Sequence, residues 1–72
     1  MKVDVHKASL NLIAAGMTRE GIAAEVRSTG ATVDNWLTGK VKRTFGATEE
    51  LLIKLLVSKN IAVPRLKESR RA

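Results

Sequence analysis

The stretch Met17–Gly39, MTREGIAAEVRSTGATVDNWLTG, decides the fold of this chain. It holds two short amphipathic segments separated by the polar residues RSTG at 27–30. Thr18 is suited to cap the first segment, because its hydroxyl can accept a hydrogen bond from an amide of the first helical turn. Apolar residues recur at helical spacing: Ile22, Ala23 and Val26 in the first segment, and Val33, Trp36 and Leu37 in the second. The stretch therefore predicts two short helices that share a core, with Trp36 inside it.

Signals for further helices lie on both sides of this stretch. Asp4 is a suitable cap for a helix near the N-terminus, and the residues after it follow the helical rhythm. Downstream, Thr48 is expected to cap a leucine-rich helix that carries Glu49 and Glu50 in its first turn and ends near Asn60. The prediction is an all-α fold, a compact bundle of four to five short helices containing a helix-turn-helix.

The predicted number of helices, four or five, depends on how the C-terminal segment is interpreted. Pro64 either starts a short fifth helix, from Arg65 to about Ser69, or simply breaks the chain. A chain of 72 residues has room for one domain. We therefore expect residues 1–66 to form a single helix-turn-helix domain and residues 67–72 to form a basic, frayed tail.

The composition excludes several classes of function. The chain has no Cys, which removes disulfides and thiol chemistry and suits the reducing cytoplasm. No apolar run approaches the ~20 residues that a membrane span needs. His6 has no partner at metal-ligand spacing and is expected at the surface, and the glycines match no phosphate-binding loop or dinucleotide fingerprint. We expect no enzyme activity, no cofactor, no metal site, no membrane association and no small-molecule substrate.

Positive charge is concentrated in the second half of the chain. Lys and Arg balance Asp and Glu in residues 1–37, so the net charge of +6 lies entirely in residues 38–72. One part of it belongs to the segment TGKVKRTFGA at 38–47, which is predicted to be a loop, and another to the cluster Arg65–Arg71. By itself, this charge indicates a polyanionic partner, either a nucleic acid or a membrane surface.

The second helix of the deciding stretch has an outward face of small and amide side chains. Such a face can enter the major groove of B-DNA, which is about 12 Å wide, without steric clash. The base-reading candidates on this face are Thr29, Gly30, Ala31, Thr32 and Asn35. Asn35 is the strongest candidate, because its amide can pair bidentately with adenine.

The same stretch resembles the helix-turn-helix of the lambda-repressor-like family, and specifically the small phage Cro and repressor domains. That pattern has a polar residue opening its second helix, an alanine at the fifth position, an aliphatic residue three positions further on, and apolar residues in the recognition helix. The matching residues here are Arg19, Ala23, Val26, Val33 and Trp36. The resemblance continues into residues 39–43, GKVKR, which look like the basic loop that follows the recognition helix in lambdoid repressors.

The resemblance implies a sequence-specific, double-stranded DNA-binding transcriptional regulator. It would be a Cro-like phage or prophage repressor that binds an operator and occludes a promoter, in the cytoplasm of a bacterial host and associated with the nucleoid. The residues that it assigns to phosphate binding are Arg19, Lys40, Lys42 and Arg43. A homodimer is expected on a pseudo-palindromic operator, with its dimer surface either in the loop before the last helix or at Ile61–Leu66.

A protein-interaction module is the alternative function. Antitoxin-type proteins use the same fold to bind a partner protein. In that case the apolar residues of Ile61–Leu66, which exceed what a frayed tail needs, would contact a foreign chain.

The turn between the two helices departs from the family pattern. The family usually has Gly at the position that needs a positive φ, whereas this chain has Arg27. Either Arg27 adopts the positive φ and the recognition helix starts at Thr29, or the preceding helix runs on, Gly30 takes the positive φ and Thr32 caps a later helix. In the second arrangement, the base-reading residues would be Thr32, Asp34 and Asn35. The spacing of the apolar residues favours the first arrangement.

Overall fold

Four helices make up most of residues 2–66, the part of the chain that the computed structural model describes. They are α1 (Val5–Ala14), α2 (Arg19–Glu25), α3 (Gly30–Leu37) and α4 (Gly46–Ser58). The predicted all-α bundle is therefore confirmed. The fifth helix is absent at residues 65 and 66, where Arg65 instead forms an isolated antiparallel bridge with Val3. The rest of that predicted helix and the tail 67–72 lie outside the described residues.

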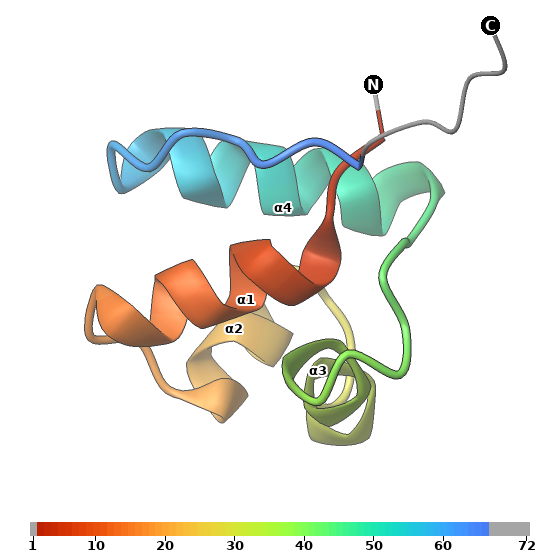
Figure 1. Ribbon diagram of the computed structural model, residues 1–72. Helices are drawn as coiled ribbons and strands as arrows, with labels where there is room; N and C mark the ends of the chain where they lie inside the picture. Colours follow the sequence, from red (N-terminus) through yellow and green to blue (C-terminus); the bar gives the residue numbers. More distant parts are fainter. Residues whose placement is uncertain (1, 67–72) are drawn as a thin grey trace, which may run out of the picture.

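Figure 1 shows how the helices are layered. In this view α4 lies along one side of the molecule and α2 and α3 lie on the opposite side, with α2 packed against α4 and α1 packed against α2 and α3. The segment that follows α4 runs back along it toward the start of the chain. None of the helices in residues 2–66 is long and apolar enough to cross a membrane.

Local side-chain caps explain where the first three helices begin. The side chains of Asp4, Thr18 and Thr29 accept hydrogen bonds from the backbone amides of Lys7, Gly21 and Thr32, at 3.1, 3.0 and 3.2 Å. Each cap satisfies an amide that has no partner within its own helix. The predictions of Asp4 and Thr18 as N-caps are confirmed.

The predicted start of α4 is wrong. The helix begins at Gly46, and its N-cap residue is Phe45, whose side chain makes no cap hydrogen bond. Thr48 therefore lies inside the first turn instead of capping it, and Glu49 is the acidic residue of that turn. Glu49 Oε2 also accepts a hydrogen bond from the backbone amide of Val3 at 3.2 Å, which joins the first turn of α4 to the N-terminal segment.

The core is built from every helix and from Val3 in the N-terminal segment. Trp36 is its largest side chain and is only 1% exposed, which confirms its predicted place in the core. The side chains of Ile22 and Val26 are buried from α2 and its C-cap, and Val33 is buried from α3. This shared apolar contact holds α3 in a fixed position while leaving its other face outside.

The two ends of the described chain are joined by backbone hydrogen bonds. The amide of Asp4 donates to the carbonyl of Pro64, and the amide of Leu66 donates to the carbonyl of Lys2, both at 2.9 Å. Ile61 and Val63 are partly buried against the core. The apolar residues of the C-terminal segment are thus used largely within this chain.

Candidate nucleic-acid interface

The turn between α2 and α3 is centred on Arg27. This residue has a φ of 57°, in the left-handed region, whereas Gly30 is not among the residues with positive φ. The amide of Ser28 donates to the carbonyl of Ala23 at 2.9 Å, so α2 closes before the turn, and Thr29 then caps α3. The first of the two predicted arrangements is therefore confirmed.

The C-terminal end of α3 is held by a contact that sequence reasoning missed. His6 of α1 lies half-buried, and its Nδ1–H donates to the carbonyl oxygen of Trp36 at 2.8 Å. The His6 ring also lies against Gly39, which follows the C-cap residue of α3 and has a φ of 82°. The sequence predicted a surface histidine because His6 has no partner at metal-ligand spacing, and no local pattern points to a residue thirty positions away.

The five base-reading candidates lie together in the first two turns of α3. Thr29, Ala31 and Asn35 are exposed, and Gly30 and Thr32 are half-buried. The hydroxyls of Thr29 and Thr32 lie 3.2 Å apart, and Thr29 Oγ1 also caps the helix. Asn35 differs from them, because its side chain makes no hydrogen bond with any described residue. Its amide is free to recognise a partner.

Arg19 is already paired with two carboxylates. Its Nη1 contacts Asp34 Oδ2 at 2.7 Å, and its Nη2 contacts Glu20 Oε2 at 2.9 Å. These hydrogen bonds, with Asp34 the larger contributor, raise the pKa of Arg19 above its usual value. The pKa of Glu20 is lowered, first by a hydrogen bond from its own backbone amide and then by Arg19. The cation that was assigned to phosphate binding is therefore neutralised within the chain.

The loop cations differ in their surroundings. Lys40 and Lys42 are exposed, whereas Arg43 is half-buried. The guanidinium carbon of Arg43 lies 4.3 Å from the centre of the Phe45 ring, and its Nε is buried without a partner among the described residues. Two backbone hydrogen bonds tie this loop to the bundle: the amide of Val41 donates to the carbonyl of Asn35, and the amide of Val5 donates to the carbonyl of Lys42, both at 3.1 Å.

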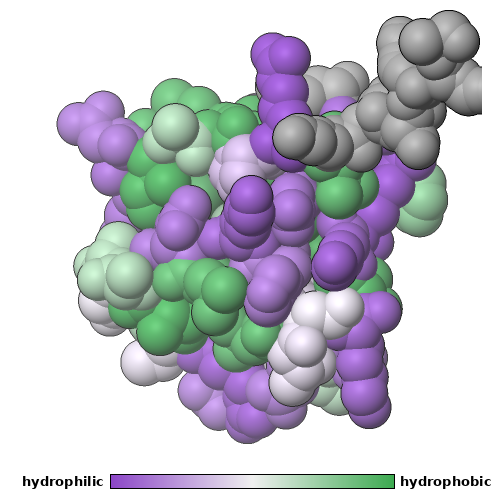
Figure 2. Space-filling view, viewed as in Figure 1, coloured by the Kyte–Doolittle hydropathy of each residue, from purple (hydrophilic) through white to green (hydrophobic). Residues whose placement is uncertain are grey.

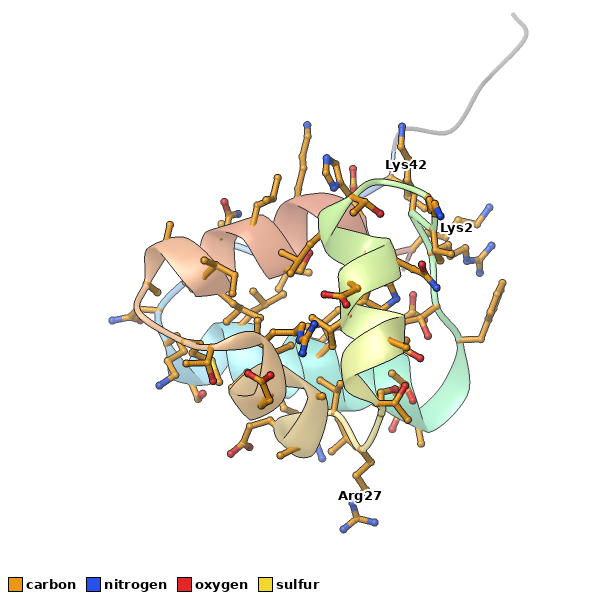
Figure 3. The ribbon with its side chains drawn as sticks, turned by 90° about the horizontal axis from the view of Figure 1, so that it is seen from below. Lys2, Arg27 and Lys42 are labelled. Carbon is orange, nitrogen blue, oxygen red and sulfur yellow. The ribbon has the colours of Figure 1, made fainter. Side chains whose placement is uncertain are left out.

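Exposed cations flank α3 at both ends. Figure 3, in which α3 faces the viewer, shows Arg27 projecting near its N-terminal end and Lys42 beyond its C-terminal end. Sequence reasoning gave Arg27 no binding role, because it considered only the strain of the turn. The local charge sequence offered a signal, since Arg27 directly precedes the reading helix. In the described residues, no three His, Cys or acidic side chains come together in a group that could hold a metal ion.

Comparisons of this chain with protein-family models, with curated proteins and with solved structures found no match.

Proposed function

We propose that this chain is a sequence-specific, double-stranded DNA-binding transcriptional regulator of the Cro-like repressor type. The observation that carries the proposal is the exposed face of α3, with small and amide side chains and the Arg19-paired Asp34 in the middle and cations at both ends. Buried Val33 and Trp36 anchor the opposite face of the same helix. A rigidly held helix with such a face is suited to the major groove.

The proposed contacts divide into two kinds. Arg27, Lys40 and Lys42 bind phosphates on either side of the groove, and these contacts supply affinity without regard to sequence. Asn35 pairs with adenine through its free amide and supplies sequence preference. Ala31 is exposed next to it and is small enough to allow close approach to a thymine methyl group.

A single copy of so small a module makes few contacts. We therefore infer that two copies bind a pseudo-palindromic operator in the bacterial cytoplasm, with half-sites about one helical turn apart. Occupation of such a site would occlude a promoter. The alternative function, an antitoxin-type interaction module, relied on apolar residues at Ile61–Leu66. Because Ile61 and Val63 pack against this chain's own core, we do not adopt it.

A mobility-shift assay over a salt series tests the proposal. The probes are genomic duplexes that neighbour the coding sequence and a scrambled duplex of equal length. We expect a preferred site, and a logarithm of affinity that falls with the logarithm of salt concentration by about 0.9 per phosphate contact. Equal affinity for every duplex at each salt concentration would contradict sequence-specific regulation.

Two substitutions separate the proposed roles. Asn35→Ala should relax the base preference and leave the salt dependence nearly unchanged, because it removes a base contact. Lys42→Ala should weaken binding to all duplexes alike and reduce the salt slope by about one. If Asn35→Ala kept the full base preference, the assignment of Asn35 to base reading would be wrong.

A further inference from the structure

Asp34 places a carboxylate on the proposed reading face of α3. The side chain is 49% exposed, and its Oδ2 is held by Arg19 Nη1 at 2.7 Å. The other oxygen, Oδ1, makes no hydrogen bond with any described residue. One oxygen is thus fixed by the protein, and the other is available to accept a hydrogen bond from outside it.

Arg19 is itself held in place from two further sides. Glu20 Oε2 contacts its Nη2 at 2.9 Å, and the guanidinium lies against Gly30, where an added Cβ would be 3.4 Å from Nε. The guanidinium therefore bridges the start of α2 and the first turns of α3. This arrangement limits the rotamers of Asp34, because a displaced carboxylate would lose a short charge-assisted hydrogen bond.

The charge of this cluster is unsuited to a phosphate. Glu20 and Asp34 carry two negative charges and Arg19 carries one positive charge, so the cluster repels an anion brought close to it. In the major groove, the acceptors N7 and O6 of guanine and O4 of thymine would also be unfavourable partners. Adenine and cytosine both carry an amino donor in the major groove. The N6 amino group of adenine has the N7 acceptor beside it on the same base, whereas the N4 amino group of cytosine, from which carboxylates accept in direct readout, has no acceptor beside it on its own base.

We infer that Asp34 is a specificity-determining residue that selects a cytosine at one position of each half-site, through a hydrogen bond from the N4 amino group to Oδ1. This inference rests on the proposed function. Arg19 acts as a positioning residue: it orients the carboxylate and does not bind a phosphate. The cost of a wrong base arises because the acceptors of guanine and thymine, and N7 of adenine, would face a fixed negative charge.

Selection of binding sites from a randomised duplex pool tests the inference. The proteins compared are the unaltered chain, Asp34→Asn and Glu20→Gln. Both substitutions remove one carboxylate from Arg19 and keep nearly the same shape. The Glu20→Gln side chain keeps an amide oxygen that can accept from Arg19, so the guanidinium stays held, and only Asp34 lies on α3. Both side chains are exposed, Glu20 at 72%, so both variants should fold, which circular dichroism checks.

We expect the unaltered chain and Glu20→Gln to favour cytosine at one position by roughly tenfold, the usual cost of one mismatched pair. Asp34→Asn should lose that preference at this position and keep the others. If Asp34→Asn kept the cytosine, or if Glu20→Gln lost it equally, the inference would be overturned while the proposed function stood. If the unaltered chain selected no sequence at all, both would be overturned.

Arg19→Gln tests the positioning role separately. We expect it to weaken the cytosine preference and to leave the salt slope for a fixed duplex unchanged. A slope reduced by about one, with the cytosine preference intact, would instead identify Arg19 as a phosphate contact and overturn this part of the inference.

Discussion

Arg27 combines two opposing effects in one residue. Its φ of 57° lies in the left-handed region, which costs an L-residue about 1–2 kcal/mol and which glycine adopts without that cost. Its side chain is exposed and projects near the N-terminal end of α3 (Figure 3), where the proposed function uses its charge. At this position the arginine costs backbone energy that glycine would not cost, and it supplies a positive charge that glycine would lack.

Replacement of Arg27 by Gly should stabilise the fold by about 0.5–1 kcal/mol, because relief of the backbone strain exceeds the added chain entropy of glycine. The same variant should bind DNA more weakly, because it lacks the cation. Urea unfolding and mobility shifts measure the two effects. Arg27→Ala is the matched control, since it lacks the charge but keeps the strain. A Gly variant that was no more stable than the Ala variant would refute the strain argument.

Among the elements, α4 begins in an unusual way. Phe45 has the extended conformation of an N-cap residue, with φ −139° and ψ 163°, but its side chain cannot accept a hydrogen bond. The ring is 66% exposed and stacks instead with the Arg43 guanidinium. The amides of the first turn therefore lack the side-chain cap that α1, α2 and α3 each have.

Comparison of Phe45→Ser with Phe45→Ala isolates the value of a cap at this position. Both variants lose the aromatic ring and its contact with Arg43, so their difference reports the serine hydroxyl alone. We expect Phe45→Ser to be more stable than Phe45→Ala by about 1 kcal/mol, the usual value of an N-cap hydrogen bond. Chemical denaturation measures both. Equal stability would mean that water already satisfies these amides.

A helix start could be predicted from the sequence where a local capping residue marks it. Asp4 and Thr18 are local caps, so the sequence alone placed the starts of α1 and α2 correctly. The end of the last helix near Asn60 was likewise predicted, and Asn60 directly follows the C-cap residue of α4 with a φ of 62°. The start of α4 was missed because its N-cap residue is Phe45, whose side chain cannot form the capping hydrogen bond that marks a helix start in a sequence. His6 and the Arg19–Asp34 pair were not foreseen because their contacts join residues 30 and 15 positions apart, which no local pattern encodes.

At the scale of the whole molecule, the positive charge of the second half does not form one surface. Lys40 and Lys42 belong to the loop after α3, whereas Lys54 lies in α4 and Lys59 directly follows it. Figure 1 shows α4 on the side of the molecule opposite α2 and α3. The net charge of residues 38–72 therefore overestimates the number of cations that the loop after α3 can present to DNA.

The exposed surface also carries apolar side chains outside the proposed interface. Figure 2 shows an apolar patch over α1, and the exposed large apolar residues of that helix are Leu10 and Ile13. They lie three positions apart and so share one face of α1. A patch of two residues is ordinary for a small protein, so it needs no partner to explain it.

Removal of the C-terminal segment tests whether it belongs to the cooperative fold. A chain that ends after Asn60 loses Ile61 and Val63 from the core and leaves the amide of Asp4 without its partner at Pro64. Each buried aliphatic side chain contributes about 1.5–3 kcal/mol, and these two are only partly buried. Because small domains have about 5–15 kcal/mol of total stability, we expect the shortened chain to melt many degrees lower or not to fold.

A chain that ends after Leu66 is the control, since it keeps these contacts. Thermal melting followed by circular dichroism compares the two, and equal midpoints would show that the segment adds nothing to the cooperative unit.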